Sequence, residues 1–188
     1  MKTGNADFNR LLEAQIPRLR RYARALTRDV SRADDLVQSC LARAVAKQHL
    51  WQPGTDLRAW LFTLLHNQHV NLVRRSIREG VSVDVEELAP VLTTKAGQNP
   101  RLQLRDLHRA MGSLPDEQRQ VVLLVALEGM SYEQVAEVLG VPVGTVRSRL
   151  SRGREALRRL MDLRGGEAIV TPDLVSGSRS AVLPALSA

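Results

Sequence analysis

The chain has 188 residues, 44% of them hydrophobic but only 3% aromatic, and a formal net charge of +7 at pH 7. This length excludes a large core and allows one modest hydrophobic core or two small ones, while the scarcity of aromatic residues favours helices over strands. The positive charge indicates a polyanionic partner, although an acidic protein surface or an anionic membrane would attract the same field.

A first domain of helices is predicted over residues 8–75. Apolar residues spaced by three and four positions predict a short amphipathic helix from Phe8 to Ile16, and Pro17 is expected to start the next helix. Ser31, with Asp34 three positions later, is expected to cap a further helix, because both side chains accept hydrogen bonds from first-turn N–H groups. The predicted buried stripe of this helix comprises Leu36, Val37, Cys40, Leu41, Ala44 and Val45.

The opposite face of the same helix is polar and carries Asp34, Asp35 and Gln38. By residue type alone these side chains belong to a solvated surface, and only a partner would give them a binding role. Cys40 is the only cysteine, which excludes an internal disulfide, and its place in the apolar stripe predicts a buried thiol.

A Pro53-Gly54 turn precedes a long predicted helix that ends in Arg74 and Arg75. His66 and His69 lie three positions apart on it, but no cysteine or carboxylate stands beside them at ligand spacing, so no metal site is predicted. The predicted buried residues of this helix are Leu57, Trp60, Leu61, Leu64, Leu65 and Leu72.

Residues 76–99 lose helical periodicity and are rich in acidic side chains, which predicts a flexible acidic linker. An unstructured loop of this length is unusual inside one compact domain, so two separately folded units are expected rather than one core. The last segment, residues 165–188, is rich in small residues with proline and glycine and is predicted to be disordered.

The second predicted domain spans residues 100–164 and ends in a helix-turn-helix. Its earlier helices are indicated by Leu102, Leu107 and Met111, and by Leu114-Pro115 followed by Val121, Val122, Leu124 and Val125. The fold class is therefore all-α, with two small helical domains joined by a flexible acidic linker.

The helix-turn-helix is indicated by a helical pattern that breaks at Gly140, where a left-handed backbone needs no Cβ, and resumes near Pro142. Its first helix is expected to bury Tyr132, Val135, Ala136 and Leu139, and its second Val146, Leu150, Gly153 and Leu157. The guanidinium groups of arginines and the short hydroxyl side chains on the outward face can hydrogen-bond to guanine edges and phosphates in a major groove. The alternative is a solvated basic face on a helical hairpin. The outward residues are Thr145, Arg147, Ser148, Arg149, Ser151, Arg152 and Arg154.

Several function classes lack their sequence signals. The sequence contains no glycine-rich phosphate loop, catalytic carboxylate pair or nucleophile elbow, so neither an enzyme nor a cofactor is predicted. No apolar run approaches the roughly eighteen residues that span a bilayer, and no export signal opens the chain. A cytoplasmic protein without membrane insertion is expected.

Three motifs in order resemble conserved regions two and four of the extracytoplasmic-function (ECF) group of bacterial sigma factors, the smallest members of the sigma-70 family of RNA polymerase. The resemblance covers about Phe8 to Met161. The motifs are ADDLVQSCLARAVAK, LRAWLFTLLHNQHVNLVRR and LPDEQRQVVLLVALEGMSYEQVAEVLGVPVGTVRSRLSRGREAL.

This resemblance implies a factor that binds core RNA polymerase, recognises a two-part promoter and helps to open its minus-ten segment. It assigns Asp34, Asp35 and Gln38 to the clamp helices of the polymerase by charge-assisted contacts. It also implies minus-ten recognition, with bases held by amides and by a pocket in the loop from Trp51 to Thr55, and phosphates held by arginines. The side chains implied for that site are Asn67, Asn71, Arg74 and Arg75.

In the second domain, the resemblance assigns the minus-thirty-five element to Arg147, Ser148 and Arg152, while Ser151 replaces an aromatic residue of some relatives. It also implies that the acidic linker occupies a basic channel of the polymerase. An anti-sigma protein is an expected partner. Two alternatives remain from the residues: a sigma-like decoy that binds an anti-sigma protein, and a stand-alone helix-turn-helix repressor.

Overall fold

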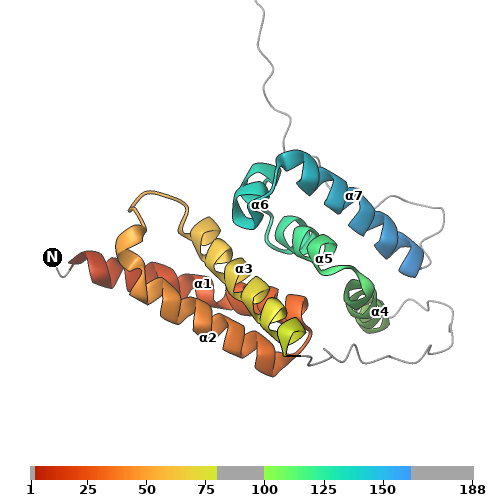
Figure 1. Cartoon of the computed structure of the whole chain (residues 1–188), viewed down its shortest axis with the longest axis horizontal. Coiled ribbons are helices and arrows are strands. Elements are labelled where there is room, and N and C mark those ends of the chain that lie inside the picture. Colours follow the sequence, from red (N-terminus) through yellow and green to blue (C-terminus); the bar gives the residue numbers. More distant parts are fainter. Residues whose placement is uncertain (1–2, 80–99, 162–188) are drawn as a thin grey trace, which may run out of the picture.

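The computed structural model describes residues 3–79 and 100–161, and all regular structure in these ranges is helical (Figure 1). This confirms the predicted all-α class. None of the helices in these ranges is both long enough and apolar enough to span a bilayer. The helices are α1 (Thr3–Thr27), α2 (Val30–Ala46), α3 (Leu57–Arg78), α4 (Pro100–Ser113), α5 (Asp116–Val122), α6 (Tyr132–Leu139) and α7 (Val143–Leu160), with a 3-10 turn η1 (Gln48–Leu50) and a π-helical turn η2 (Leu123–Leu127).

Helices α1–α3 form a first helical group, and helices α4–α7 with η2 form a second one beside it (Figure 1). Helix α3 continues to Arg78, so the first residues of the predicted linker are helical. The rest of the linker prediction, residues 80–99, and the predicted disorder of residues 165–188 lie outside the described residues, as does the Leu102 side chain.

Helix α1 is continuous through Pro17, whereas the sequence predicted two helices that meet there. Proline lacks the N–H that a helix interior uses, so local propensity favours a break. The structure nevertheless buries Phe8 and Leu12 before Pro17 and Leu19 and Tyr22 after it. Packing of both halves against the same core therefore outweighs the lost hydrogen bond, since tertiary contacts supply most helical stability.

The next helices begin at aspartate caps. Asp29 accepts a hydrogen bond from the Arg32 N–H at 2.9 Å and starts α2, so the prediction that Ser31 caps this helix is wrong. Arg28 has a left-handed backbone, with φ of 60°, and redirects the chain after α1. The cap of α2 therefore lies directly after this turn, at Asp29, and not at Ser31. Asp56 caps α3 in the same way by accepting from the Ala59 N–H at 3.1 Å.

Burial in the first helical group differs from the predicted stripes at several positions. Leu11, Val45 and Leu72 are more than two-fifths exposed, whereas Phe62 and His69 are buried. Helix α3 touches α1 and α2 on one side and α6 on another, so the face that it buries is wider than one apolar stripe and displaced from it. The predicted core residue Trp60 is half-buried, with its ring edge-on to Phe8 at 6.4 Å.

The prediction of a buried Cys40 thiol is confirmed. Cys40 is fully buried and its Sγ lies 3.5 Å from the Leu61 carbonyl oxygen. Burial raises the pKa of this thiol to about 12, so it is protonated and unreactive near neutral pH.

The predicted helix-turn-helix is confirmed in α6 and α7. Ser131 and Gln134 form a reciprocal capping box at the start of α6, and Gly140 ends it in the left-handed conformation at φ of 64°. Pro142 precedes the first residue of α7. Val135, Val146, Leu150 and Gly153 are buried as predicted, together with Val138, while Tyr132, Ala136, Leu139 and Leu157 are half-buried.

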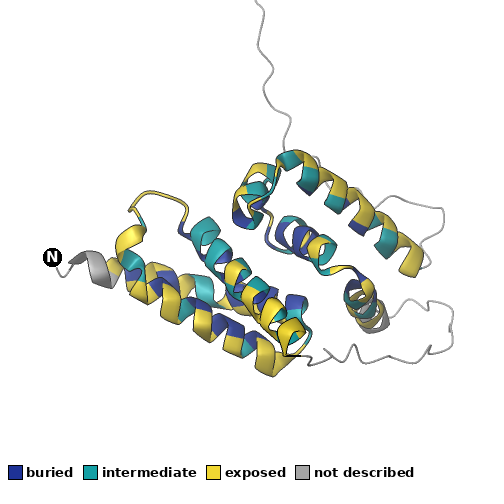
Figure 2. Ribbon diagram, in the orientation of Figure 1, coloured by how far each residue is buried: buried dark blue, intermediate teal, exposed yellow. Residues whose placement is uncertain are grey.

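The two helical groups share one continuous cluster of buried side chains, which differs from the expectation of separate cores (Figure 2). Helix α3 packs against α6, and α1 packs against η2. The long segment between the groups led to the expectation of separate cores. The sequence alone does not show that α3 packs against α6 of the second group as well as against α1 and α2.

Candidate nucleic-acid interface

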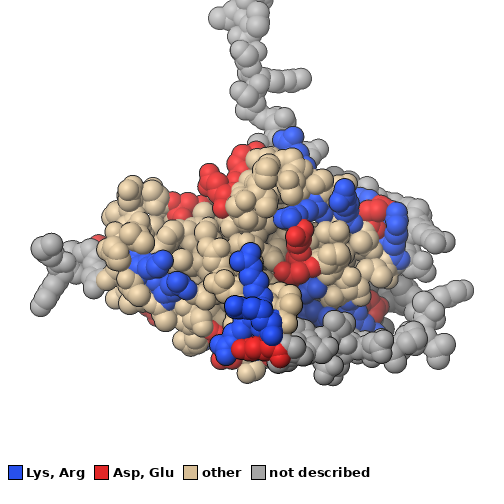
Figure 3. Space-filling model, in the orientation of Figure 1, with Lys and Arg blue, Asp and Glu red and all other residues tan. Residues whose placement is uncertain are grey.

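The outward face of α7 presents Arg147, Ser148, Ser151 and Arg152, all of them exposed. Because α7 turns every 3.6 residues, these positions lie on one side of the helix, opposite buried Val146 and Leu150. Basic side chains line this part of the molecule (Figure 3). The structure therefore brings these four predicted residues together on a single face that a nucleic acid can approach.

Arg149 and Thr145 are placed differently from this exposed face. The Arg149 guanidinium donates to Glu117 of α5 at 2.6 Å, and its side chain is only 22% exposed. Thr145 is half-buried, and its carbonyl accepts from the Ser148 hydroxyl at 3.0 Å. Arg149 therefore ties α7 to α5 in this structure.

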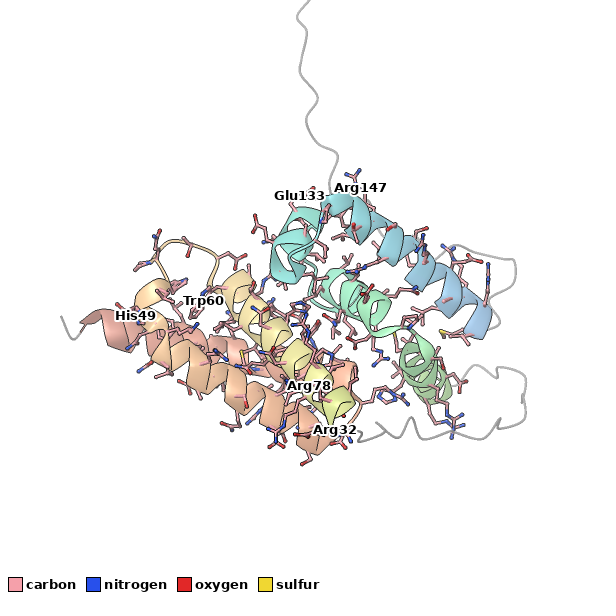
Figure 4. All side chains as sticks on the ribbon, viewed as in Figure 1. Arg32, His49, Trp60, Arg78, Glu133 and Arg147 are labelled. Carbon is pink, nitrogen blue, oxygen red and sulfur yellow. The ribbon has the colours of Figure 1, made fainter. Side chains whose placement is uncertain are left out.

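Arg147 is supported by residues of α6. Its guanidinium carbon lies 5.9 Å from the centre of the Tyr132 ring, within the range of a cation–π contact. Glu133 and Arg147 stand together where α6 meets α7 (Figure 4). Hydrogen bonds from its own backbone N–H and from Ser131 lower the pKa of Glu133, and the charge of Arg147 lowers it further. The sequence pattern marked Tyr132 only as a core residue and did not indicate this support.

A second polar face lies on the C-terminal half of α3. Asn67, Asn71, Arg74 and Arg75 are all exposed, as the minus-ten prediction requires. Arg75 donates to Glu79 at 2.7 Å, while Asn71 and Arg74 line an open hollow together with Ile77 and Arg78. Basic side chains gather over this end of the helix (Figure 3). Arg78 was not predicted, although its spacing of four residues from Arg74 was the available signal.

The loop before α3 is anchored at one end and exposed elsewhere. The Trp51 ring packs against Phe8, with ring centres 5.5 Å apart. Gln52, Pro53, Gly54 and Thr55 are exposed, and the Thr55 hydroxyl donates to the Gln52 carbonyl at 2.7 Å. The loop is thus held against α1 by an aromatic contact, while the rest of its predicted pocket faces solvent.

The predicted polymerase-binding residues lie on α2. Asp35 and Gln38 are exposed. Asp34 is half-exposed, and its carboxylate lies 3.8 Å from the Arg24 guanidinium. The acidic face is therefore accessible, with Asp34 partly neutralised by a neighbour.

His66 and His69 both point toward α5 of the second helical group. His66 Nδ1 lies 2.7 Å from Gln120 Oε1, and His69 Nε2 lies 3.1 Å from both carboxylate oxygens of Asp116. Burial lowers the pKa of His66 despite its contact with Gln120. Sequence reasoning weighed these histidines only as a metal pair, because α5 is remote from them along the chain.

Comparisons with known protein families match both helical groups. A family profile described as the Sigma2 domain of PhyR matches residues 12–66, and one described as Sigma-70, region 4 matches residues 104–157. The chain is 39% identical to the ECF RNA polymerase sigma factor EcfG of Rhodopseudomonas palustris (strain TIE-1), over 86% of this chain and 89% of the relative. It is 30% identical to the ECF RNA polymerase sigma factor SigM of Mycobacterium tuberculosis, over 82% and 76% of the two chains.

Solved structures show the same arrangement of helices. The sigma factor RpoE of Bartonella quintana, in complex with the anti-sigma factor NepR, aligns with a TM-score of 0.70 and 34% identity over 85% of this chain and 99% of that one. CnrH, in complex with the cytosolic domain of CnrY, aligns with a TM-score of 0.62 and 28% identity over 84% and 89%.

Proposed function

This chain belongs to the extracytoplasmic-function sigma factors, and from that membership we propose which promoter element each of its two helical groups recognises. It binds core RNA polymerase and directs promoter-specific initiation of transcription. The α7 face of Arg147, Ser148, Ser151 and Arg152 reads the minus-thirty-five element, with α7 in the major groove. The exposure of these arginines and hydroxyls on one side of a helix-turn-helix carries this proposal.

The minus-ten element is recognised by the loop before α3 and by the α3 face, which consists of Asn67, Asn71, Arg74 and Arg75. The amides of Asn67 and Asn71 present donors and acceptors to bases that leave the stack, and Arg74 and Arg75 hold phosphates. Their common exposure supports this role. Arg78 is added to the phosphate-binding set, because it lines the same hollow as Arg74.

The α2 face of Asp34, Asp35 and Gln38 binds core polymerase. As a sigma factor, the chain is a regulator of initiation, and the chemistry of RNA synthesis belongs to the polymerase that it directs. We place it in the cytoplasm, where that polymerase works. An anti-sigma protein is its regulator, in line with the complexes of similar sigma factors with NepR and CnrY.

Run-off transcription tests this function. Purified chain and core polymerase are incubated with a pool of genomic promoter fragments, and start sites are mapped. Discrete start sites that depend on the chain are expected, each with shared sequence near minus ten and minus thirty-five. Arg152→Ala should abolish most of them, whereas Arg158→Ala, at the far end of α7, should retain them. A chain that gives no start site while a known sigma factor does so would contradict the function.

A further inference from the structure

The most exposed large hydrophobic side chain in the described parts of the chain is Ile77, near the C-terminal end of α3. It is 71% exposed, whereas Leu61, Phe62 and Leu65 of the same helix are buried. Apolar side chains that are scattered singly over a surface are ordinary, so exposure alone assigns no role to Ile77. What distinguishes Ile77 is the set of side chains around it.

Ile77 lines an open hollow of about 560 Å³ together with Asn71, Arg74 and Arg78. These three polar residues form one stripe along α3, because they are spaced by three and four positions, and Ile77 lies beside the stripe, three residues after Arg74. Asn71 and Arg74 belong to the α3 face, and Arg78 stands at the end of the same helix (Figure 4). The hollow is therefore continuous with the proposed minus-ten site.

The charge of the hollow is positive. Helix α3 contains no acidic residue, and Glu79, which follows it, is bound to Arg75 at 2.7 Å. Among the described residues, no carboxylate forms an ion pair with Arg74 or Arg78. Two guanidinium groups one helical turn apart, without an acidic neighbour, are suited to the phosphates of a nucleic acid.

An apolar side chain beside phosphate-binding arginines needs a contact other than phosphate. The edges of the DNA bases offer it one apolar group, the C5 methyl group of thymine. The amide of Asn71, in contrast, hydrogen-bonds to donors and acceptors of a base. DNA whose backbone lies on Arg74 and Arg78 therefore presents base edges to two different kinds of side chain in the same hollow.

We propose that Ile77 is a specificity-determining residue of the minus-ten site and that it contacts the C5 methyl group of a thymine. The inference rests on the proposed role of α3 in minus-ten recognition and names one contact within it. Arg74 and Arg78 fix the position of the DNA backbone, whereas Ile77 distinguishes thymine from the other bases by an apolar contact. The occupant of the hollow is thus promoter DNA.

Replacement of thymine by deoxyuridine tests this contact, because it removes the methyl group and keeps the base-pairing edge. A promoter found by run-off transcription is prepared with one such replacement at each thymine in and beside its minus-ten element. The complex of the full chain with core polymerase should bind one of these templates about fourfold more weakly, the factor that corresponds to one buried methyl group. The position that responds identifies the thymine.

The Ile77→Ala chain should bind the parent template about fourfold more weakly or worse, and it should no longer distinguish that template from the one with deoxyuridine at the identified position. The double-mutant cycle of side chain and methyl group separates their contact from other effects. Leu104→Ala truncates a 65% exposed leucine on α4 and is the matched control, which should keep the full response to deoxyuridine. Ile77→Val keeps a β-branched apolar side chain and should retain most of the response.

Arg78→Ala provides a contrast within the same hollow. Loss of a phosphate contact should weaken binding equally on all templates and make binding less dependent on salt, while the response to deoxyuridine persists. A response that disappears in Arg78→Ala as completely as in Ile77→Ala would count against a methyl contact made by Ile77.

The inference would be overturned if no deoxyuridine template binds more weakly than its parent, or if Ile77→Ala leaves binding unchanged or weakens it equally on both templates. Weaker binding of Ile77→Ala to core polymerase in the absence of DNA would assign the side chain to a protein contact and overturn the inference as well. Failure of the unsubstituted chain to initiate at any promoter would instead contradict the proposed function, so the two failures are distinguishable.

Discussion

Arg147 and Arg152 share the exposed face of α7, but only Arg147 has the Tyr132 ring beneath it. Alanine at either position should cost about 1–3 kcal/mol at one base pair of the minus-thirty-five element, as a lost bidentate contact does. Tyr132→Leu should reproduce part of the Arg147 loss and none of the Arg152 loss, because it removes the ring but keeps apolar bulk. Fluorescence anisotropy on duplexes with single base-pair changes measures this, with Arg158→Ala as control. Equal losses on every duplex would indicate phosphate contacts instead.

Arg149 should behave differently from its neighbours on α7, because its guanidinium is bound to Glu117. Arg149→Ala should leave base preference unchanged and reduce stability by no more than about 1 kcal/mol, since Glu117 is mostly exposed. A double-mutant cycle with Glu117→Ala in urea unfolding should give a coupling of similar size. A base-specific loss as large as that of Arg147→Ala would show that Arg149 leaves Glu117 to read DNA.

At the scale of the helices, Gly153 sets the distance between α7 and α5. A Cβ at this position would meet Val122 Cγ2 at 2.8 Å, while a Cβ at Gly144 in the same helix would meet nothing within 4 Å. Gly153→Ala should therefore destabilise the chain by about 1–3 kcal/mol through overpacking. Gly144→Ala should instead stabilise it by up to about 1 kcal/mol through helix propensity. Urea unfolding of the full chain compares the matched pair, and equal effects would contradict the packing argument.

The helix-turn-helix was predictable from sequence because its signals are local. Gly140 marks the turn, and buried positions such as Val146 and Leu150 follow at helical spacing. What sequence reasoning missed depends on distant partners: His69 is buried because Asp116 lies across from it, and Arg149 is held by Glu117. Helical periodicity describes one buried face, so it could not show that α3 contacts both groups.

At the scale of the whole molecule, the α2 face of Asp34, Asp35 and Gln38 and the α7 face lie on different helical groups. Asp35→Ala should weaken binding to core polymerase about tenfold or more, as the loss of a charged hydrogen bond does. Binding to a minus-thirty-five duplex should not change, because distant sites act independently. Competition with a labelled sigma factor for core polymerase measures the loss. Glu137→Ala, an exposed acid on α6, is the control, and an equal effect of both variants would contradict the assignment.

The ion pair of Arg21 with Glu128 and the contact of His69 with Asp116 join the two helical groups, and the side chains of Glu128 and His69 are buried. Added salt screens such partly buried pairs much less than it screens exposed charges, so it should loosen the groups little. The same salt weakens the phosphate contacts that hold DNA. Rising ionic strength should therefore release DNA from this sigma factor well before it separates the two helical groups.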